Sequence, residues 1–210
     1  MTTVERPGGS PPGADGFAGM VRSPAWRAEV QAWVEATLAR MGVAALGVPE
    51  QRRVRPWSTQ LVVPTSAGRV WFKANAPGLA HEPALQDALA RIAPDRVEAP
   101  LGTDPGRGWM LTRDRGATLA DDHEPSLAEW CELVQEAADL QRRAAVEACV
   151  LLATGLPDCS PATVPGRFDA LLETYAALPP EHPAHLGADE RSAFDAAARA
   201  VAEACAVLAN

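Results

Sequence analysis

The apolar positions in the first fifth of the chain follow a helical period. Ser23-Pro24 supplies a helix cap and a proline at the first helical position, and apolar residues then recur at helical spacing until Gly42. They are Trp26, Val30, Trp33, Val34, Leu38 and Met41. The pattern predicts an amphipathic helix with its tryptophans in the core. The preceding residues 1–22 are rich in glycine and proline, and we expect them to form a disordered leader.

The period changes from helical to alternating after residue 51. Three strands of an antiparallel meander are predicted over residues 53–56, 60–64 and 69–74, with turns at 57–59 and 65–68. In the third strand, Val70 and Phe72 point to one face, and Trp71 and Lys73 point to the other. The meander therefore carries a lysine on an aromatic-rich strand.

A second helix is predicted to begin at Glu82, because the proline that follows is accepted in a first helical turn. The residues that it is expected to bury are Leu85, Leu89 and Ile92. Two more strands, over residues 97–101 and 109–112, are joined by turn residues. The predicted fold class is α+β, with a five-stranded antiparallel sheet and one inserted helix.

The chain after residue 116 is predicted to be helical. Ser126 and Glu129 form a capping box, and apolar residues line one face over 127–148. Further helices are predicted over 168–178 and from Asp189 onward. The last helix carries an apolar face, Phe194, Val201 and Leu208, and we expect a partner or a missing C-terminal segment to cover it.

The composition narrows the classes of partner. Nineteen Lys and Arg against 27 Asp and Glu give a net charge of -8, which opposes binding to nucleic acid or to an anionic membrane. The same charge would attract a cationic small molecule, although many proteins are acidic for solubility alone. We find no signal peptide and no apolar run of about 20 residues that could span a bilayer, and we expect a cytoplasmic protein.

No metal site is predicted. Cys131, Cys149, Cys159 and Cys205 lack metal-ligand spacing, and three of them fall in helical patterns as small core residues. The acidic residues of the linker, Asp121, Asp122 and Glu124, are typical of a solvated segment. His182 and His185 are interrupted by a proline and lack a third ligand.

The most informative spacing joins Lys73 to Glu82, nine residues later. A carboxylate in a first helical turn faces the positive end of the helix dipole, and a strand lysine facing a helix glutamate is the arrangement that holds ATP phosphates in kinases. An ordinary surface lysine and a first-turn glutamate would give the same spacing. Ser58 and Thr59 in the first turn could offer hydroxyls to a phosphate, or could belong to a polar hairpin turn.

These features together resemble the aminoglycoside phosphotransferase-like branch of the kinase superfamily, from about residue 52 onward. The likeness rests on Phe72-Lys73-Ala74, His81-Glu82-Pro83, Trp109-Met-Leu-Thr-Arg-Asp-Arg-Gly116 and Leu140-Gln141. It implies a kinase-like fold with an ATP-binding N-terminal lobe over residues 23–115 and an incomplete helical C-terminal lobe over 116–210.

The resemblance also implies roles for individual residues. Lys73 would bind the α and β phosphates of ATP, and Glu82 would orient Lys73. Ser58 and Thr59 would lie over the phosphates. Adenine would meet the segment after the last strand, which contains Arg113, Asp114 and Gly116.

The sequence departs from the family at the catalytic loop. In the family, the helix corresponding to Asp189–Ala209 is followed by His-Gly-Asp-x-x-x-x-Asn, whose Asp positions the substrate hydroxyl and whose Asn holds magnesium. The only asparagines here are Asn75 and Asn210. We therefore assign no catalytic residue and no metal ligand, and the resemblance places the magnesium ligands beyond residue 210.

Two interpretations remain open. In the first, the chain is the N-terminal part of an ATP-dependent phosphotransferase that transfers the γ-phosphate to a hydroxyl of a small molecule. In the second, it is a catalytically inactive module of kinase-like fold that binds a nucleotide or a partner. The sequence does not identify the acceptor.

Overall fold

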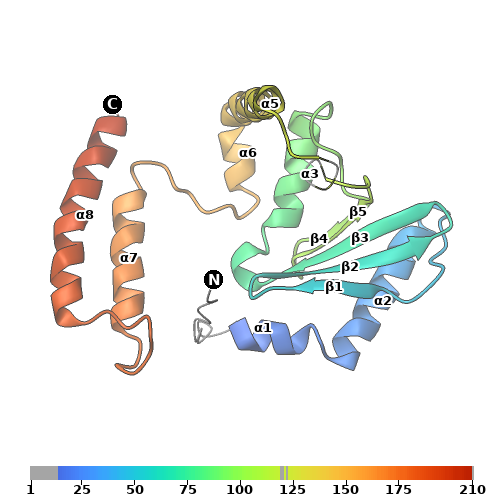
Figure 1. Ribbon diagram of the computed structural model, residues 1–210, viewed down its shortest axis with the longest axis horizontal. Coiled ribbons are helices and arrows are strands. Elements are labelled where there is room, and N and C mark those ends of the chain that lie inside the picture. The colour runs from blue at the N-terminus through green and yellow to red at the C-terminus, as the bar shows by residue number, and fades with distance from the viewer. Residues whose placement is uncertain (1–13, 119–120, 122, 210) are drawn as a thin grey trace. The chain divides into compact units, whose positions relative to one another are not determined.

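The computed structural model describes residues 14–118, 121 and 123–209, which divide into two compact units (Figure 1). The larger unit contains the sheet and ends at Leu156, and the smaller unit begins at Pro157. The boundary that we expected after residue 115 falls inside the larger unit, because the helices that follow it contact α3. The two units are described separately.

Two helices precede the sheet: α1 (Ala14–Met20) and α2 (Pro24–Ala39). The Ser23 side chain accepts a hydrogen bond from the Trp26 N–H at 3.2 Å, as a helix cap does, and Pro24 is the first residue of α2. The prediction of a disordered leader is wrong for residues 14–22, because Phe17 and Val21 are buried in the core. Residues 1–13 of that leader lie outside the described residues.

The sheet has five antiparallel strands in the order β1-β2-β3-β5-β4, and it confirms the predicted α+β class. The 3-10 turn η1 (Pro77–Leu79) and helix α3 (Glu82–Ile92) are inserted between the third and fourth strands. The strands are β1 (Glu50–Val54), β2 (Ser58–Thr65), β3 (Gly68–Asn75), β4 (Gly102–Asp104) and β5 (Trp109–Arg113).

The fourth strand differs from its prediction over residues 97–101. Pro100 has no N–H to donate to a neighbouring strand, so regular pairing begins only after it. The Leu101 N–H donates to the Leu111 carbonyl at 2.7 Å, and β4 then continues for three residues. Gly102 lies against α2, where a Cβ would approach Thr37 Cγ2 to 2.5 Å, so only glycine allows this contact without a shift.

The main core lies between α2 and one face of the sheet. It contains a cluster of aromatic rings in edge-to-face contact, with centroids 5.4 to 6.2 Å apart. The rings belong to Trp26, Trp33, Phe72 and Trp109. The prediction that the tryptophans of α2 belong to the core is confirmed. The opposite face of the sheet carries a different set of side chains.

Helices α5 (Leu127–Val146) and α6 (Ala148–Leu152) complete the larger unit. The predicted capping box is present, since Ser126 and Glu129 bond reciprocally at the start of α5. The apolar residues share one face, as predicted, and that face is exposed: Leu127 is 80% exposed, Trp130 55% and Val134 65%. Cys131 and Cys149, which we expected in the core, are also exposed.

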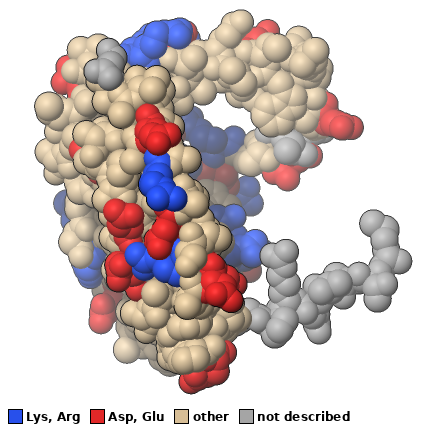
Figure 2. Space-filling view, turned by 90° about the vertical axis from the view of Figure 1, so that its left-hand side faces the viewer, with Lys and Arg blue, Asp and Glu red and all other residues tan. Residues whose placement is uncertain are grey.

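The smaller unit is a pair of packed helices, α7 (Val164–Ala176) and α8 (Ala188–Leu208), close to the helices predicted there. Arg191 on α8 bonds Glu173 on α7 and Asp195 on its own helix, each at 3.0 Å. Figure 2 shows acidic and basic side chains close together on this side of the protein. Within the described residues of this unit, only Leu172 and Cys205 are buried, while Phe194 and Leu208 are exposed.

A search of the described residues finds no helix with the length and apolar character needed to cross a bilayer.

Candidate functional site

The site is built around Lys73, at the centre of the sheet. Lys73 lies on β3 between Gln60 of β2 and Met110 of β5. Because side chains alternate along a strand, Lys73 points to the face opposite that of Phe72, which is buried against α2. The alternation predicted from the sequence is therefore present.

Glu82 meets Lys73 from the first turn of α3. The chain leaves β3, turns through η1 and enters α3 with His81 as the residue before the helix. The Lys73 ammonium donates a hydrogen bond to the Glu82 carboxylate, and the two side chains are 22% and 30% exposed. An ion pair that stays this accessible can still accept a ligand on its open side.

Lys73 lines a hollow of about 430 Å³ on this face of the sheet, and Glu82 is not one of its lining residues. Lys73, Arg113 and Arg115 supply positive charge, and Glu98 is the acidic residue in its wall. Trp71 also lines the hollow, two residues before Lys73 on the same face of β3. The other lining residues are Gln60, Gln86, Met110 and Thr112. In a chain of net charge -8, this concentration of cations favours an anionic ligand.

Glu98 organises the two arginines. Arg115 donates from Nε and from a terminal nitrogen to the two Glu98 oxygens, at 2.7 and 2.6 Å, and Arg113 donates to one of them at 2.8 Å. The bonds from Arg115 and Arg113 lower the pKa of Glu98 below its ordinary value, and Arg115 has the larger effect. The contact with Glu98 in turn raises the pKa of Arg115. One carboxylate is thus shared by two guanidinium groups, which leaves an excess of positive charge.

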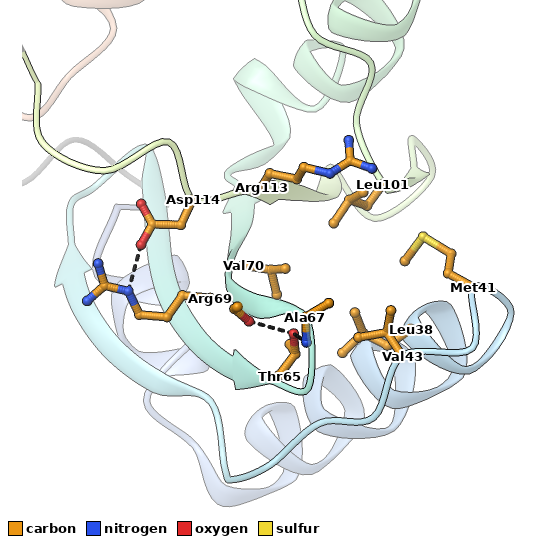
Figure 3. A pocket seen from close by; sticks show the side chains of 11 residues that line it. Leu38, Met41, Val43, Thr65, Ala67, Arg69, Val70, Leu101, Arg113 and Asp114 are labelled. Atoms are coloured by element: carbon orange, nitrogen blue, oxygen red, sulfur yellow. Dashed lines mark hydrogen bonds and ion pairs between the residues drawn. The ribbon is translucent and has the colours of Figure 1, made fainter.

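Asp114 and Gly116 form the turn that follows β5. The Gly116 N–H donates to Asp114 at 2.9 Å, and this bond, with Arg69 adding its charge, lowers the pKa of Asp114. Asp114 also forms an ion pair with Arg69 at 2.7 Å, which Figure 3 shows. Of the predicted adenine-binding residues, Arg113 lines the Lys73 hollow, whereas Asp114 and Gly116 do not.

Ser58 and Thr59 lie within β2 and not in a turn, and both are buried. Thr59 pairs with Ala74, so its side chain lies on the face opposite that of Lys73. Its hydroxyl donates to the Arg53 carbonyl at 2.8 Å and accepts a hydrogen bond from Gln51 at 2.9 Å. Neither residue lines the hollow beside Lys73, and we leave both out of the proposed site.

Glu98 and Trp71 are site residues that our sequence reasoning did not assign, and Arg115 was included only as part of the segment expected to meet adenine. The signal that could have drawn attention to this face is compositional: Lys73 is the only lysine in the chain, and the other basic residues are all arginines. In such a chain, a lysine at the centre of a sheet stands out. Arg115 and Glu98 carry no comparable signal, because their contact spans 17 residues of irregular chain and a strand pair.

No set of three His, Cys, Asp or Glu side chains among the described residues is arranged to hold a metal ion. The prediction of no metal ligand in this chain stays a prediction, and no residue is assigned to magnesium.

Comparisons of the chain with protein-family models, with curated proteins and with solved structures found no match.

Proposed function

We propose that the hollow beside Lys73 binds the phosphates of a nucleotide, and that the protein belongs to the kinase-like, aminoglycoside phosphotransferase-like class. The observation that carries the proposal is the ion pair between a β3 lysine and a glutamate in the first turn of α3, beside a hollow lined by two arginines. Support also comes from the order of elements, in which one helix is inserted between the third and fourth strands of a five-stranded sheet.

Each residue has a separable role in this proposal. Lys73 donates N–H bonds to phosphate oxygens, and Glu82 holds its ammonium in place so that little side-chain freedom is lost on binding. Arg115 and Arg113 add positive charge at the edge of the hollow. The Trp71 ring, next along the same face of β3, offers an apolar surface to the rest of the nucleotide.

The reaction of this class would transfer the γ-phosphate of ATP to a hydroxyl of a small acceptor, and the acidic net charge would favour a cationic one. Bound magnesium would neutralise charge on the phosphates. The described residues provide the phosphate-binding side of that chemistry. The sequence contains no His-Gly-Asp stretch to supply a base, and a general base is typically worth about 10²–10⁴ in rate. We therefore expect nucleotide binding without appreciable transfer by these 210 residues alone.

The second candidate function is a module that binds a nucleotide or a protein partner without chemistry. It is favoured by the exposed apolar side chains of α5, since contiguous exposed apolar surface is typical of interaction sites. If the module binds a nucleotide, it shares the Lys73 site with the first candidate.

The test uses an acyl-phosphate derivative of ATP, which acylates an amine held beside the phosphates. The amine nitrogen bonds to the acyl carbon, the acyl–phosphate bond breaks, and ATP leaves. Because Lys73 is the only lysine, the other reactive amine of the chain is the N-terminal one. We expect labelling of Lys73, read by peptide mass spectrometry, and its suppression by an excess of magnesium-ATP.

Variants make the test specific. Glu82→Gln should reduce labelling because the ammonium is no longer held, and Arg115→Gln should weaken competition by ATP. Arg91→Gln is the matched control, since Arg91 pairs with Asp87 on α3 and does not line the hollow. Lys73 labelling that is absent, or that ATP does not suppress, would overturn the proposal.

A further inference from the structure

A second hollow, of about 290 Å³, lies where the end of α2 meets the start of β3 (Figure 3). Its walls combine apolar and charged side chains. Leu38 and Val70 are almost fully buried, and Val43 and Leu101 are packed against the same core. One wall of the hollow therefore consists of core residues, and an apolar group placed against that wall would lose contact with water without rearranging the fold.

The charged residues of this hollow are not equivalent. Arg69 and Asp114 form an ion pair at 2.7 Å and largely cancel each other's charge. In Figure 3 they point toward one another on one side, while the Arg113 side chain runs toward Leu101 on the other. Arg113 is thus the cation that faces the apolar wall.

Arg113 keeps hydrogen-bonding capacity in this position. Within the described part of the chain, its guanidinium makes one hydrogen bond, to a Glu98 oxygen at 2.8 Å. Glu98 is already held by two bonds from Arg115, so its charge is neutralised without Arg113. The remaining N–H groups of Arg113 can donate to a carboxylate as a bidentate pair.

We propose that this hollow binds a small organic acid, with its carboxylate on Arg113 and its apolar body against Leu38, Val70 and Leu101. The volume suits a ligand of about a dozen non-hydrogen atoms, for which a dissociation constant of about a millimolar or tighter is expected.

Arg113 also lines the Lys73 hollow, so the two proposals share this residue. Ala67 lines the second hollow and not the Lys73 hollow, so a substitution at Ala67 separates the failure of one proposal from the failure of the other.

The experiment titrates the wild-type protein with 3-phenylpropionate and with its uncharged analogue, 3-phenylpropionamide, by ligand-observed NMR. The two probes have the same shape and differ in charge at one end. We expect saturable binding of the acid, and we expect the amide to bind about tenfold more weakly. The reason is that a hydrogen bond to a charged group raises affinity about tenfold or more. Arg113→Gln should bring the acid to the level of the amide.

Two further variants distinguish a loss of binding from a loss of folding. Ala67→Phe places a ring in the hollow from an exposed turn and should abolish binding of both probes. Arg91→Gln, remote from the hollow, should leave both affinities unchanged. The proposal is overturned if the acid binds no better than the amide, if Arg113→Gln binds the acid as wild type does, or if binding is not saturable below about 10 mM.

Discussion

Gly108 shows how a single residue holds the end of the sheet beside α3. It has a φ of 67°, and its carbonyl accepts a bond from the Asn75 backbone N–H at 3.0 Å. A Cβ here would approach the Asn75 carbonyl oxygen to 3.1 Å and the Ala80 Cα to 3.2 Å. The backbone conformation and the lack of space both require glycine.

We predict that Gly108→Ala destabilises the protein by about 1–3 kcal/mol, through strain in the left-handed region and crowding of the backbone. Urea unfolding followed by tryptophan fluorescence would measure the change. Gly106→Ala is the matched control in the same turn, because its Cβ would make only an ordinary contact, 3.5 Å from Asp104. Equal effects of the two substitutions would contradict this account.

Glu98 gives a prediction about pH. Its folded-state pKa is lowered, mainly by Arg115, so its contribution to stability is present above the ordinary value of 4.5 and is lost as the pH falls below it. The stability difference between wild type and Glu98→Gln should therefore be largest at neutral pH and should shrink in acid. Urea unfolding at pH 7 and below pH 4.5 measures it. A difference that is independent of pH would show that Glu98 acts without its charge.

The sequence could predict the Lys73 and Glu82 pair, but not the rest of the site. That pair is local, because one strand, a short turn and one helix determine the positions of both residues. Each of these elements is predicted by its own pattern in the sequence. The placement of Thr59 depended on where β2 begins, and a strand that starts two residues earlier converts a supposed turn residue into a buried one. Glu98 and Arg115 meet through tertiary packing, which no local pattern encodes.

At the scale of elements, α5 shows that periodicity predicts where a helix forms but not whether its apolar face is buried. Its apolar spacing and its capping box predicted a helix, and the helix is there. The same spacing placed the apolar residues on one face, and in the described structure that face is exposed. Periodicity reports which residues share a face of a helix, whereas burial depends on what packs against that face.

The start of α5 gives the next prediction. Hydrogen bonds from the Ser126 side chain, from the Ser126 backbone and from His123 lower the pKa of Glu129 to about 2. The cap is therefore complete above the ordinary value of 4.5 and is lost as the pH falls toward 2. Titration of the Glu129 carboxyl by NMR should find this low value, and Ser126→Ala should raise it. A wild-type value near 4.5 would mean that the capping box does not form in solution.

For the whole molecule, the division into two units predicts two unfolding transitions. All six tryptophans lie in the larger unit, and the single tyrosine, Tyr175, lies in the smaller one. The smaller unit should unfold first, because only two of its described residues, Leu172 and Cys205, are buried. In a urea titration, loss of far-UV helical signal should begin before tryptophan fluorescence changes.

Leu172→Ala tests this order of unfolding, because it removes a buried side chain from the smaller unit. It should move the early transition to lower urea and leave the fluorescence transition in place, because Leu172 is a buried residue of α7 in the smaller unit. Coincident transitions in both signals, shifted together by the substitution, would show that the protein unfolds as one cooperative unit.

The lone lysine at the centre of β3 has one more consequence. An endoproteinase that cuts only after lysine finds a single cleavable bond in this chain, between Lys73 and Ala74, in a strand hydrogen-bonded on both sides by β2 and β5. The protease can reach that bond only when β3 leaves the sheet. The appearance of the two fragments, residues 1–73 and 74–210, would therefore time the opening of the sheet without any added label.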